Sequence, residues 1–228
     1  MEKLNITYNN INIKQHSSVS YLGCILNESL SGEQMALNVI NTVNARLKFL
    51  YRNKNIITPY LRRLLRNALI QPNFDYASSA WYPNLNAKFK KRIQVSQNKC
   101  IRFCLQLDNR AHIGFKEFEK IDWLNIADRF NQMLCTSVFK FFNKNAPDFV
   151  SDLLQPAHQI NINTRASFLK LKQPFRKTKA GQNNLSYLGP GEWNKLPNYL
   201  KQASNINSFK HKLKFYYLDK LKRNEIIN

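Results

Sequence analysis

The chain of 228 residues is short of acidic residues and has no long apolar run. Only 14 Asp and Glu stand against 35 Lys and Arg, which leaves a formal net charge of +21. A membrane-spanning helix needs roughly 18 or more apolar residues in a row, and a secretory signal needs an apolar stretch near the N-terminus. The sequence has neither. We therefore expect a soluble protein inside the cell, nuclear or cytoplasmic, without a transmembrane segment.

Acidic residues also never stand next to one another. Nucleotide addition by two metal ions requires carboxylates held close together, normally an adjacent Asp pair and a third Asp. Cys100, Cys104 and His112 fit no common zinc module, so buried core thiols are the favoured interpretation of the two cysteines. We predict no catalytic residue, no metal site, no cofactor and no enzymatic activity of the chain by itself. All four cysteines are expected to be reduced thiols: Cys24, Cys100, Cys104 and Cys135.

Positive charge is what the sequence has in excess. A net charge of +21 is more than solubility requires and indicates a polyanionic partner. Nucleic acid, RNA or DNA, is the first candidate. An anionic membrane surface attracts the same charge, but it usually needs a basic amphipathic helix with a free apolar face, and the apolar stripes here are needed for a core. No membrane partner is expected.

The positive charge is concentrated in one part of the chain. Between Glu33 and Asp108 the only acidic residue is Asp75, whereas thirteen Lys and Arg fall in the same interval. Contacts from these cations to phosphates would give affinity that depends on salt and not on sequence. The alternative is an ordinary solvated helix surface, and the one-sided excess favours nucleic acid.

Strands are expected only near the N-terminus. Residues Leu4 to Ile13 alternate polar and apolar side chains around the turn pair Asn9-Asn10, which predicts a β-hairpin. A third strand is expected at Ser18 to Leu26. Such a small sheet is marginal by itself, so we expect it to pack on something larger.

Helices are expected over most of the remaining chain, where apolar residues recur at three- and four-residue steps. Thr58 is expected to cap a helix with Leu61 and Leu64 on its inner face. Asn84 is expected to cap a long basic helix. The predicted helices are 33–51, 59–72, 74–81, 85–107, 125–143 and one starting at Ser204 or Asn207, with a further turn at Phe149 to Leu154.

Residues 155–191 lose the helical period and are predicted to be loops and short strands, with a turn at Gly189 to Gly191. The fold class is therefore mainly α (α+β): a small N-terminal β piece, a basic helical bundle and a mixed C-terminal subdomain. The expected boundaries are 1–32, 33–110 and 111–228.

Three stretches resemble the reverse transcriptases of jockey-like non-LTR (LINE-type) retrotransposons. The first, at Tyr21 to Asn27, is YLGCILN, similar to the Tyr-Leu-Gly strand after the catalytic palm, although family members often carry Asp in place of Asn27. The second runs from Val39 to Leu107 and contains the Tyr-Ala-Ser-x-x-Trp signature of the thumb at Tyr76 to Trp81. The third is the tail, with IDWLNIADRF, FKFFNKNAPDFVSDLL, TRAS at Thr164 to Ser167, GPGEWNKLP and SFKHKLKFYYL.

The resemblance implies that residues 33–110 are thumb-like and cradle a primer–template duplex through backbone contacts. It also implies a missing palm, of which residues 1–32 are the last remnant and which alone would need magnesium. Asp75 lies in the thumb signature and not in a catalytic Ala-Asp-Asp box, so it is expected to end a helix or form an ion pair. The candidate duplex contacts are Arg62, Arg63, Arg66, Lys88, Lys90, Lys91 and Arg92.

The function expected from these observations is that of a truncated reverse transcriptase fragment, which binds nucleic acid without catalysis and without sequence readout. An alternative is one part of an active RNA-directed DNA polymerase whose palm is supplied by another chain. A genomic relic with no cellular role is the third possibility.

Overall fold

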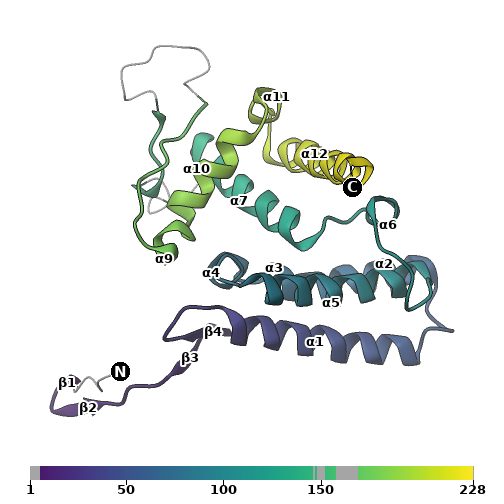
Figure 1. Ribbon diagram of the computed structural model, residues 1–228, viewed down its shortest axis with the longest axis horizontal. Coiled ribbons are helices and arrows are strands. Elements are labelled where there is room, and N and C mark those ends of the chain that lie inside the picture. The colour runs from purple at the N-terminus through teal and green to yellow at the C-terminus, as the bar shows by residue number, and fades with distance from the viewer. Residues whose placement is uncertain (1–5, 146, 148–151, 158–168, 228) are drawn as a thin grey trace.

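The computed structural model describes residues 6–145, 147, 152–157 and 169–227. It is mainly α-helical with two small antiparallel sheets, which confirms the expected fold class. In Figure 1, α1 forms the lowest tier, the helices α2 to α5 the middle tier, and α7, α10 and α12 the upper tier. Among the described residues, no helix is long and apolar enough to cross a membrane.

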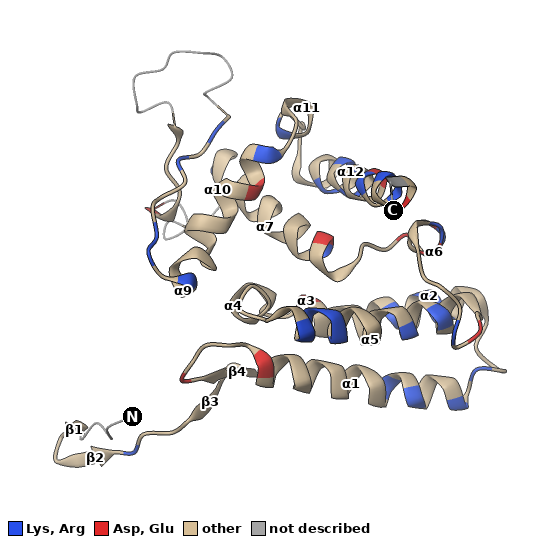
Figure 2. Ribbon diagram, in the orientation of Figure 1, with Lys and Arg blue, Asp and Glu red and all other residues tan. Residues whose placement is uncertain are grey.

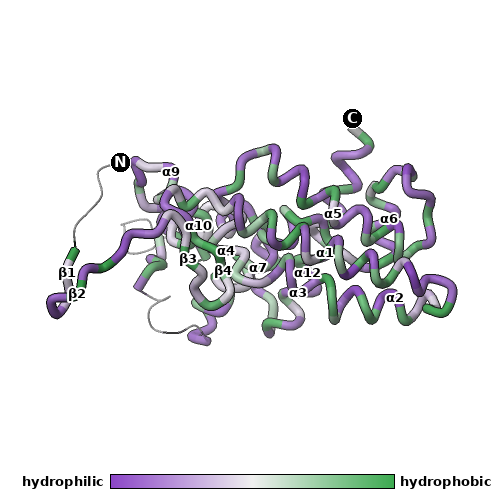
Figure 3. Tube along the Cα trace, turned by 90° about the horizontal axis from the view of Figure 1, so that it is seen from below, coloured by the Kyte–Doolittle hydropathy of each residue, from purple (hydrophilic) through white to green (hydrophobic). Residues whose placement is uncertain are grey.

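The N-terminal strands form two separate hairpins. Strands β1 (Ile6–Tyr8) and β2 (Ile11–Ile13) pair around Asn9 and Asn10, whose φ angles of 48° and 63° suit the tight primed turns of hairpins. In the described part of Leu4 to Ile13, the expected hairpin is therefore confirmed. Figure 3 shows it at one end of the molecule, with α2 at the other end.

The single strand expected at Ser18 to Leu26 is wrong, because a turn divides this segment. Strand β3 (Ser18–Tyr21) pairs with β4 (Cys24–Asn27) across Leu22 and Gly23, which both have positive φ. A glycine accepts that conformation at little cost, and the chain reverses there.

Helices α1 (Glu33–Arg52) and α5 (Ala87–Leu105) lie side by side and run parallel (Figure 1). At their N-terminal ends, Asn86 donates a hydrogen bond to Glu33 at 2.6 Å. Asn86, and not the predicted Asn84, caps α5, because its Oδ1 accepts from the backbone of Phe89 at 3.0 Å. Pro83 and Asn84, which precede this cap, form a turn.

Between these helices the chain runs through α2 (Pro59–Leu65), a π-helical turn η1 (Arg66–Ile70) and α3 (Gln71–Asp75). Thr58 caps α2 as predicted, since its Oγ1 accepts from the backbone of Leu61.

The end expected near Pro72 is wrong, because the helix continues to Asp75. Proline lacks an N–H, and its ring clashes with the carbonyl four residues earlier in an ideal α-helix. The wide turn of η1, in which the backbone N–H of Gln71 donates to Arg66, accommodates Pro72 without ending the helix. The expected helix 74–81 is consequently reduced to α4 (Ser78–Trp81).

The C-terminal half is more helical than its sequence indicates. Its elements are α6 (Phe115–Lys120), α7 (Ile126–Phe142), α9 (Lys179–Gln182), α10 (Leu185–Lys195), α11 (Asn198–Lys201) and α12 (Ile206–Ile227), as Figure 1 shows. An isolated antiparallel bridge joins Pro156 to Leu171. The expected turn around Phe149 lies largely outside the described residues, and Thr164 to Ser167 lie wholly outside them.

The turn expected at Gly189 to Gly191 is wrong, since these residues lie inside α10. A Cβ on Gly189 would come within 3.2 Å of Val138 on α7. The absence of a side chain therefore lets α10 pack closely on α7, and packing decides the conformation of a segment whose composition favours a turn.

The buried side chains of all three tiers form one hydrophobic cluster. Phe209 of α12 stacks on Phe139 of α7 with ring centroids 4.3 Å apart, and Trp193 of α10 lies 5.8 Å from Phe209. All four cysteines are free, as expected of reduced thiols, and Cys100 and Cys104 are buried in the core as expected. In the described ranges, no group of three or more His, Cys, Asp or Glu is placed to hold a metal ion.

Two glycines with left-handed backbone provide a matched test of how α1 packs. Gly32 has φ 70°, and a Cβ there would lie 2.3 Å from the carbonyl oxygen of Trp81. We expect Gly32→Ala to lower the free energy of unfolding by about 2–5 kcal/mol, because backbone strain of about 1–2 kcal/mol adds to an overlap costing about 1–3 kcal/mol.

Gly23→Ala is the control, because Gly23 has φ 76° but a Cβ there would have no neighbour closer than 3.8 Å. It should cost about 1–2 kcal/mol, the backbone strain alone. Urea denaturation followed by circular dichroism measures both losses, and equal losses would contradict the close approach of Gly32 to Trp81.

Candidate nucleic-acid interface

Helix α5 carries a row of cations along its solvent-exposed side. Lys88, Lys91, Arg92, Lys99 and Arg102 belong to it, and at 3.6 residues per turn they fall within an arc of about 100°. We call these five residues the α5 stripe. The opposite side of α5 is buried in the core. Figure 2 shows the basic segments of α5 beside those of α1.

The charge of the α5 stripe is not neutralised within the described part of the chain. Four side chains of the stripe are exposed, and none of the four ion pairs found there includes a stripe residue. The guanidinium of Arg92 lies over the ring of Phe89 at 5.0 Å, which keeps it on the helix surface. Arg102 is half-buried and donates to the carbonyl of Ala111 at 2.9 Å. One of the five donors of Arg102 is therefore used within the protein.

A groove between α1 and α5 extends this positive surface. Its volume is about 520 Å³, and Lys48 of α1 lines it together with Lys99 and Arg102 of the stripe. Tyr51 and Val95 supply part of its apolar floor, and none of its lining residues is acidic. An anionic strand lying along α5 would therefore meet cations from both helices.

Arg62, one of the predicted phosphate contacts, is buried and holds the backbone together instead. Only 4% of its surface is exposed. Its guanidinium donates to the carbonyls of Ile57 at 3.0 Å, Phe103 at 2.9 Å and Lys54 at 2.5 Å. It also lies over the ring of Phe103 at 5.0 Å. Because these bonds occupy donors on all three nitrogens, the prediction that Arg62 contacts phosphate is wrong.

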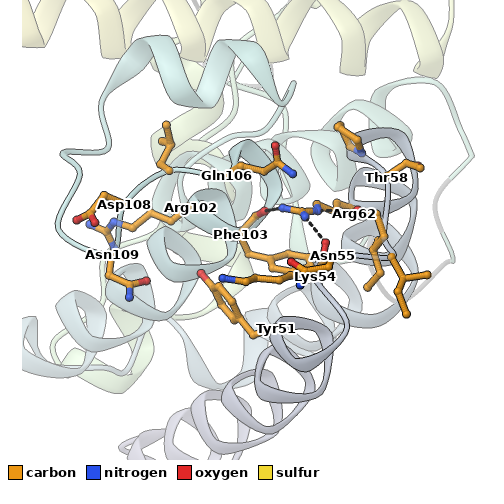
Figure 4. A pocket seen from close by; sticks show the side chains of 14 residues that line it. Tyr51, Lys54, Asn55, Thr58, Arg62, Arg102, Phe103, Gln106, Asp108 and Asn109 are labelled. Atoms are coloured by element: carbon orange, nitrogen blue, oxygen red, sulfur yellow. Dashed lines mark hydrogen bonds between the residues drawn. The ribbon is translucent and has the colours of Figure 1, made fainter.

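Figure 4 shows Arg62 at the wall of a pocket of about 690 Å³ between the α1–α2 connection and the end of α5. Lys54 and Arg102 also line this pocket, and so does Asp108. The carboxylate of Asp108 and the satisfied guanidinium of Arg62 make this pocket a weaker anion site than the groove.

Arg66 is also buried, with 6% of its surface exposed. Its Nη1 donates to the carbonyl of Ile121 at 3.1 Å and its Nη2 to the side chain of Asn67 at 2.6 Å. It cannot reach the backbone of a duplex lying on the protein surface, so its prediction as a duplex contact is wrong.

The two errors share a cause, because the buried face of this helical segment is turned from the expected one toward Arg62 and Arg66, and of the expected leucines only Leu65 and Leu69 pack on the core. Leu61 and Leu64, expected inside, are 37% and 51% exposed. The arginines take the inner positions because unpaired carbonyls of the α1–α2 connection, of α5 and of Ile121 need donors there. A hydrophobic pattern records apolar side chains but not backbone carbonyls that lack a partner.

The other five predicted phosphate contacts lie on two helices, four of them on two different sides of α5 and one on α2. Lys88, Lys91 and Arg92 lie together in the α5 stripe, whereas Arg63 is exposed on α2. Lys90 is half-buried with its Nζ 5.4 Å from the ring of Tyr82. Burial, with a smaller effect of Lys179, lowers the pKa of Lys90. The structure thus brings three of the seven candidates onto one surface.

Lys48, Lys99 and Arg102 were not among the predicted contacts. Helical phase identifies Lys99 and Arg102, since they share the arc of Lys88 and Arg92. No local signal identifies Lys48, because its place depends on the packing of α1 beside α5.

Asp75 has the ion-pairing role expected of it. It ends α3 and accepts from Nε and Nη2 of Arg129 on α7, at 3.1 and 2.7 Å. The pair joins α3 to α7 and leaves Asp75 no role in neutralising the α5 stripe.

No family model, no curated protein and no solved structure matches the chain. The assignment of a function therefore rests on the geometry and chemistry of the chain itself.

The structural role of Arg62 can be separated from that of the exposed arginines by the same substitution at two positions. Arg62→Leu should lower the free energy of unfolding by about 3 kcal/mol or more, because three carbonyls lose their donor at about 1 kcal/mol or more each. Arg92→Leu should change it by no more than about 0.5 kcal/mol. Chemical denaturation of the two variants tests this difference, and a small effect of Arg62→Leu would contradict the hydrogen bonds described.

Proposed function

We propose that the chain binds the backbone of a nucleic-acid duplex through the α5 stripe and the adjoining α1–α5 groove, without catalysis. One observation carries the proposal: five cations share one face of α5 while no described acidic residue pairs with them. Such a surface favours a polyanion whose charges repeat along a line.

The dimensions of the stripe suit a duplex. From Lys88 to Arg102 the helix rises about 21 Å at 1.5 Å per residue. Duplex DNA carries one phosphate per roughly 1.7 Å of its axis, so about a dozen phosphates lie within that length. Several can be contacted at once by side chains as long as those of Lys and Arg.

The type of residue indicates how the duplex is bound. Lys and Arg on a helix surface contact phosphates and position a duplex, whereas sequence is read by side chains that reach base edges in a groove. The proposed binding is therefore independent of sequence and strongly dependent on salt.

The resemblance to non-LTR reverse transcriptases refines the proposal. In that interpretation residues 33–110 are a thumb, and the duplex is a primer–template hybrid of RNA and DNA. A-form duplexes are recognised mainly by shape and backbone, which agrees with a surface of cations. The chain then corresponds to the thumb and tail of such a polymerase, and we expect it to bind the duplex without extending the primer.

A second candidate function has a specific observation in its favour. Apolar side chains on the strands are exposed, among them Tyr8, Ile11 and Tyr21 at 65–70%. Exposed apolar surface of this kind marks an interaction site. It supports the alternative in which the strands pack on the palm of a related polymerase and the chain contributes a thumb to an active enzyme.

Charge removal on the α5 stripe tests the proposed function directly. The triple variant Lys88→Gln, Lys91→Gln, Lys99→Gln should bind a labelled RNA–DNA hybrid more weakly at every sequence. The slope of log affinity against log salt should fall by about 2–3, because each lost phosphate contact removes about 0.7–0.9. Fluorescence anisotropy across a salt series measures both quantities.

A variant with the same change of net charge is the control. Lys212, Lys220 and Lys222 are exposed on α12, and replacing all three with Gln removes the same charge away from the stripe. This variant should keep most of the affinity and slope. Equal losses in the two triple variants would contradict an interface on α5 and indicate only a non-local effect of net charge.

Primer extension distinguishes the two candidates. With magnesium and a primer–template, the chain alone should bind but add no nucleotide, because it lacks an adjacent carboxylate pair. Extension by the chain alone would overturn this expectation. Stimulation of a palm-containing fragment would favour the second candidate.

A further inference from the structure

A polar pocket lies where η1 and α3 meet α7 and α12, on residues that the α5 stripe does not include. Its volume is about 430 Å³, and Arg66, Arg129, Lys210 and Lys214 line it, with Asp122 as the one carboxylate. We call it the π-turn pocket, because Arg66 is the first residue of the π-helical turn. Figure 1 shows these segments in the middle and upper tiers.

The buried guanidinium of Arg66 has an unused donor. Its Nη1 and Nη2 bond to Ile121 and Asn67, but its Nε is buried and has no hydrogen-bond partner among the described residues. The guanidinium lies 4.8 Å from the ring of Trp123, which covers one of its faces. Burial lowers the pKa of Arg66, against a smaller opposing effect of the nearby carboxylate of Asp122.

An unpaired buried donor is costly, and a buried cation without a carboxylate is more so. No ion pair of the described chain includes Arg66. A π-helical turn is also an uncommon element that occurs frequently at functional sites. Arg66 also lines the pocket, so an acidic ligand bound there would lie against its guanidinium and supply the negative charge that this cation lacks.

The other cations of the pocket are only partly neutralised. Lys214 pairs with Asp122 at 2.5 Å, and Arg129 pairs with Asp75, which does not line the pocket. Lys210 forms no ion pair among the described residues and stands exposed at the rim on α12. Arg66 and Lys210 are therefore the two lining cations that form no ion pair among the described residues, one buried and one at the rim.

From this arrangement we infer that the π-turn pocket binds the phosphate group of a small phosphorylated molecule. A phosphate carries close to two negative charges and several acceptor oxygens, which matches two free cations with several donors better than a single carboxylate does. Small-molecule pockets usually measure about 300–1,000 Å³, and this pocket is at the small end. A duplex is too wide to reach Arg66, so this site differs from the proposed duplex interface.

The test uses the full chain and inorganic phosphate as the probe, titrated by calorimetry at constant ionic strength with chloride as the balancing anion. The expected result is saturable binding of one phosphate per chain. Adenosine monophosphate and adenosine form two further arms. Tighter binding of the monophosphate identifies a nucleotide-like ligand, equal binding identifies the phosphate group alone, and adenosine should not bind.

Two neighbouring lysines of α12 provide a matched pair of variants. Lys210→Gln should weaken phosphate binding by about threefold to tenfold, since it removes a charged donor at the rim. Lys212→Gln should leave it unchanged, because Lys212 is exposed on the same helix but does not line the pocket. Equal effects of the two substitutions, or the absence of saturable binding to the wild-type chain, would overturn the inference.

Arg66 itself is tested by substitution and by spectroscopy. Arg66→Met, which keeps the length but removes the donors, should lower phosphate affinity by about tenfold or more. If that variant does not fold, the Nε–H resonance of Arg66 in a proton–nitrogen spectrum of the wild-type chain gives the same information. The resonance should shift as phosphate is added, and the dissociation constant fitted to that shift should equal the one measured by calorimetry. An unmoved resonance would place the phosphate elsewhere.

Discussion

The buried guanidinium of Arg62 is the contact on which the arrangement of α1, α2 and α5 depends. It joins the α1–α2 connection to the end of α5 by donating to the carbonyls of Lys54, Ile57 and Phe103. Without these bonds, three backbone acceptors near the core would lack partners, and the connection would have little to fix it against α5. Arg62 thus fixes the end of the connection against α5, while buried side chains of α1 and α5 hold the two helices together and align Lys48 with Lys99.

The same chemistry explains why the number of cations overstates the number available to a ligand. Of the thirteen Lys and Arg between Glu33 and Asp108, Arg62 and Arg66 are buried, and Arg46 donates to the carbonyl of Leu69. An arginine carries five donors and a long stem, so it can satisfy distant backbone carbonyls that no shorter residue reaches. In this chain, net charge indicates the kind of partner, and burial decides which cations can meet it.

How far the sequence predicts this fold depends on whether one face of a segment is plainly apolar. Helices α1 and α7 follow their periodic side chains, and their predicted bounds agree with the structure to within a residue or two. Helix α10 has no such pattern, because its close approach to α7 requires glycine at 189, which by composition favours a turn. The α5 stripe follows from helical phase alone. By contrast, the turned face of α2 and the groove between α1 and α5 depend on tertiary hydrogen bonds and packing that no local pattern contains.

Burial also separates the two proposed anion-binding surfaces by their expected response to salt. The exposed cations of the α5 stripe act through water, where the screening length is about 10 Å at 0.1 M salt and shrinks as salt rises. Arg66 acts from inside the protein, where screening is weaker and a hydrogen bond to a charged group retains more of its strength. Rising salt should therefore release a duplex from α5 well before it weakens phosphate binding in the π-turn pocket. The two sites are thus distinguished by the burial of Arg66 as against the exposure of the α5 stripe, and not by the number of charges they contain.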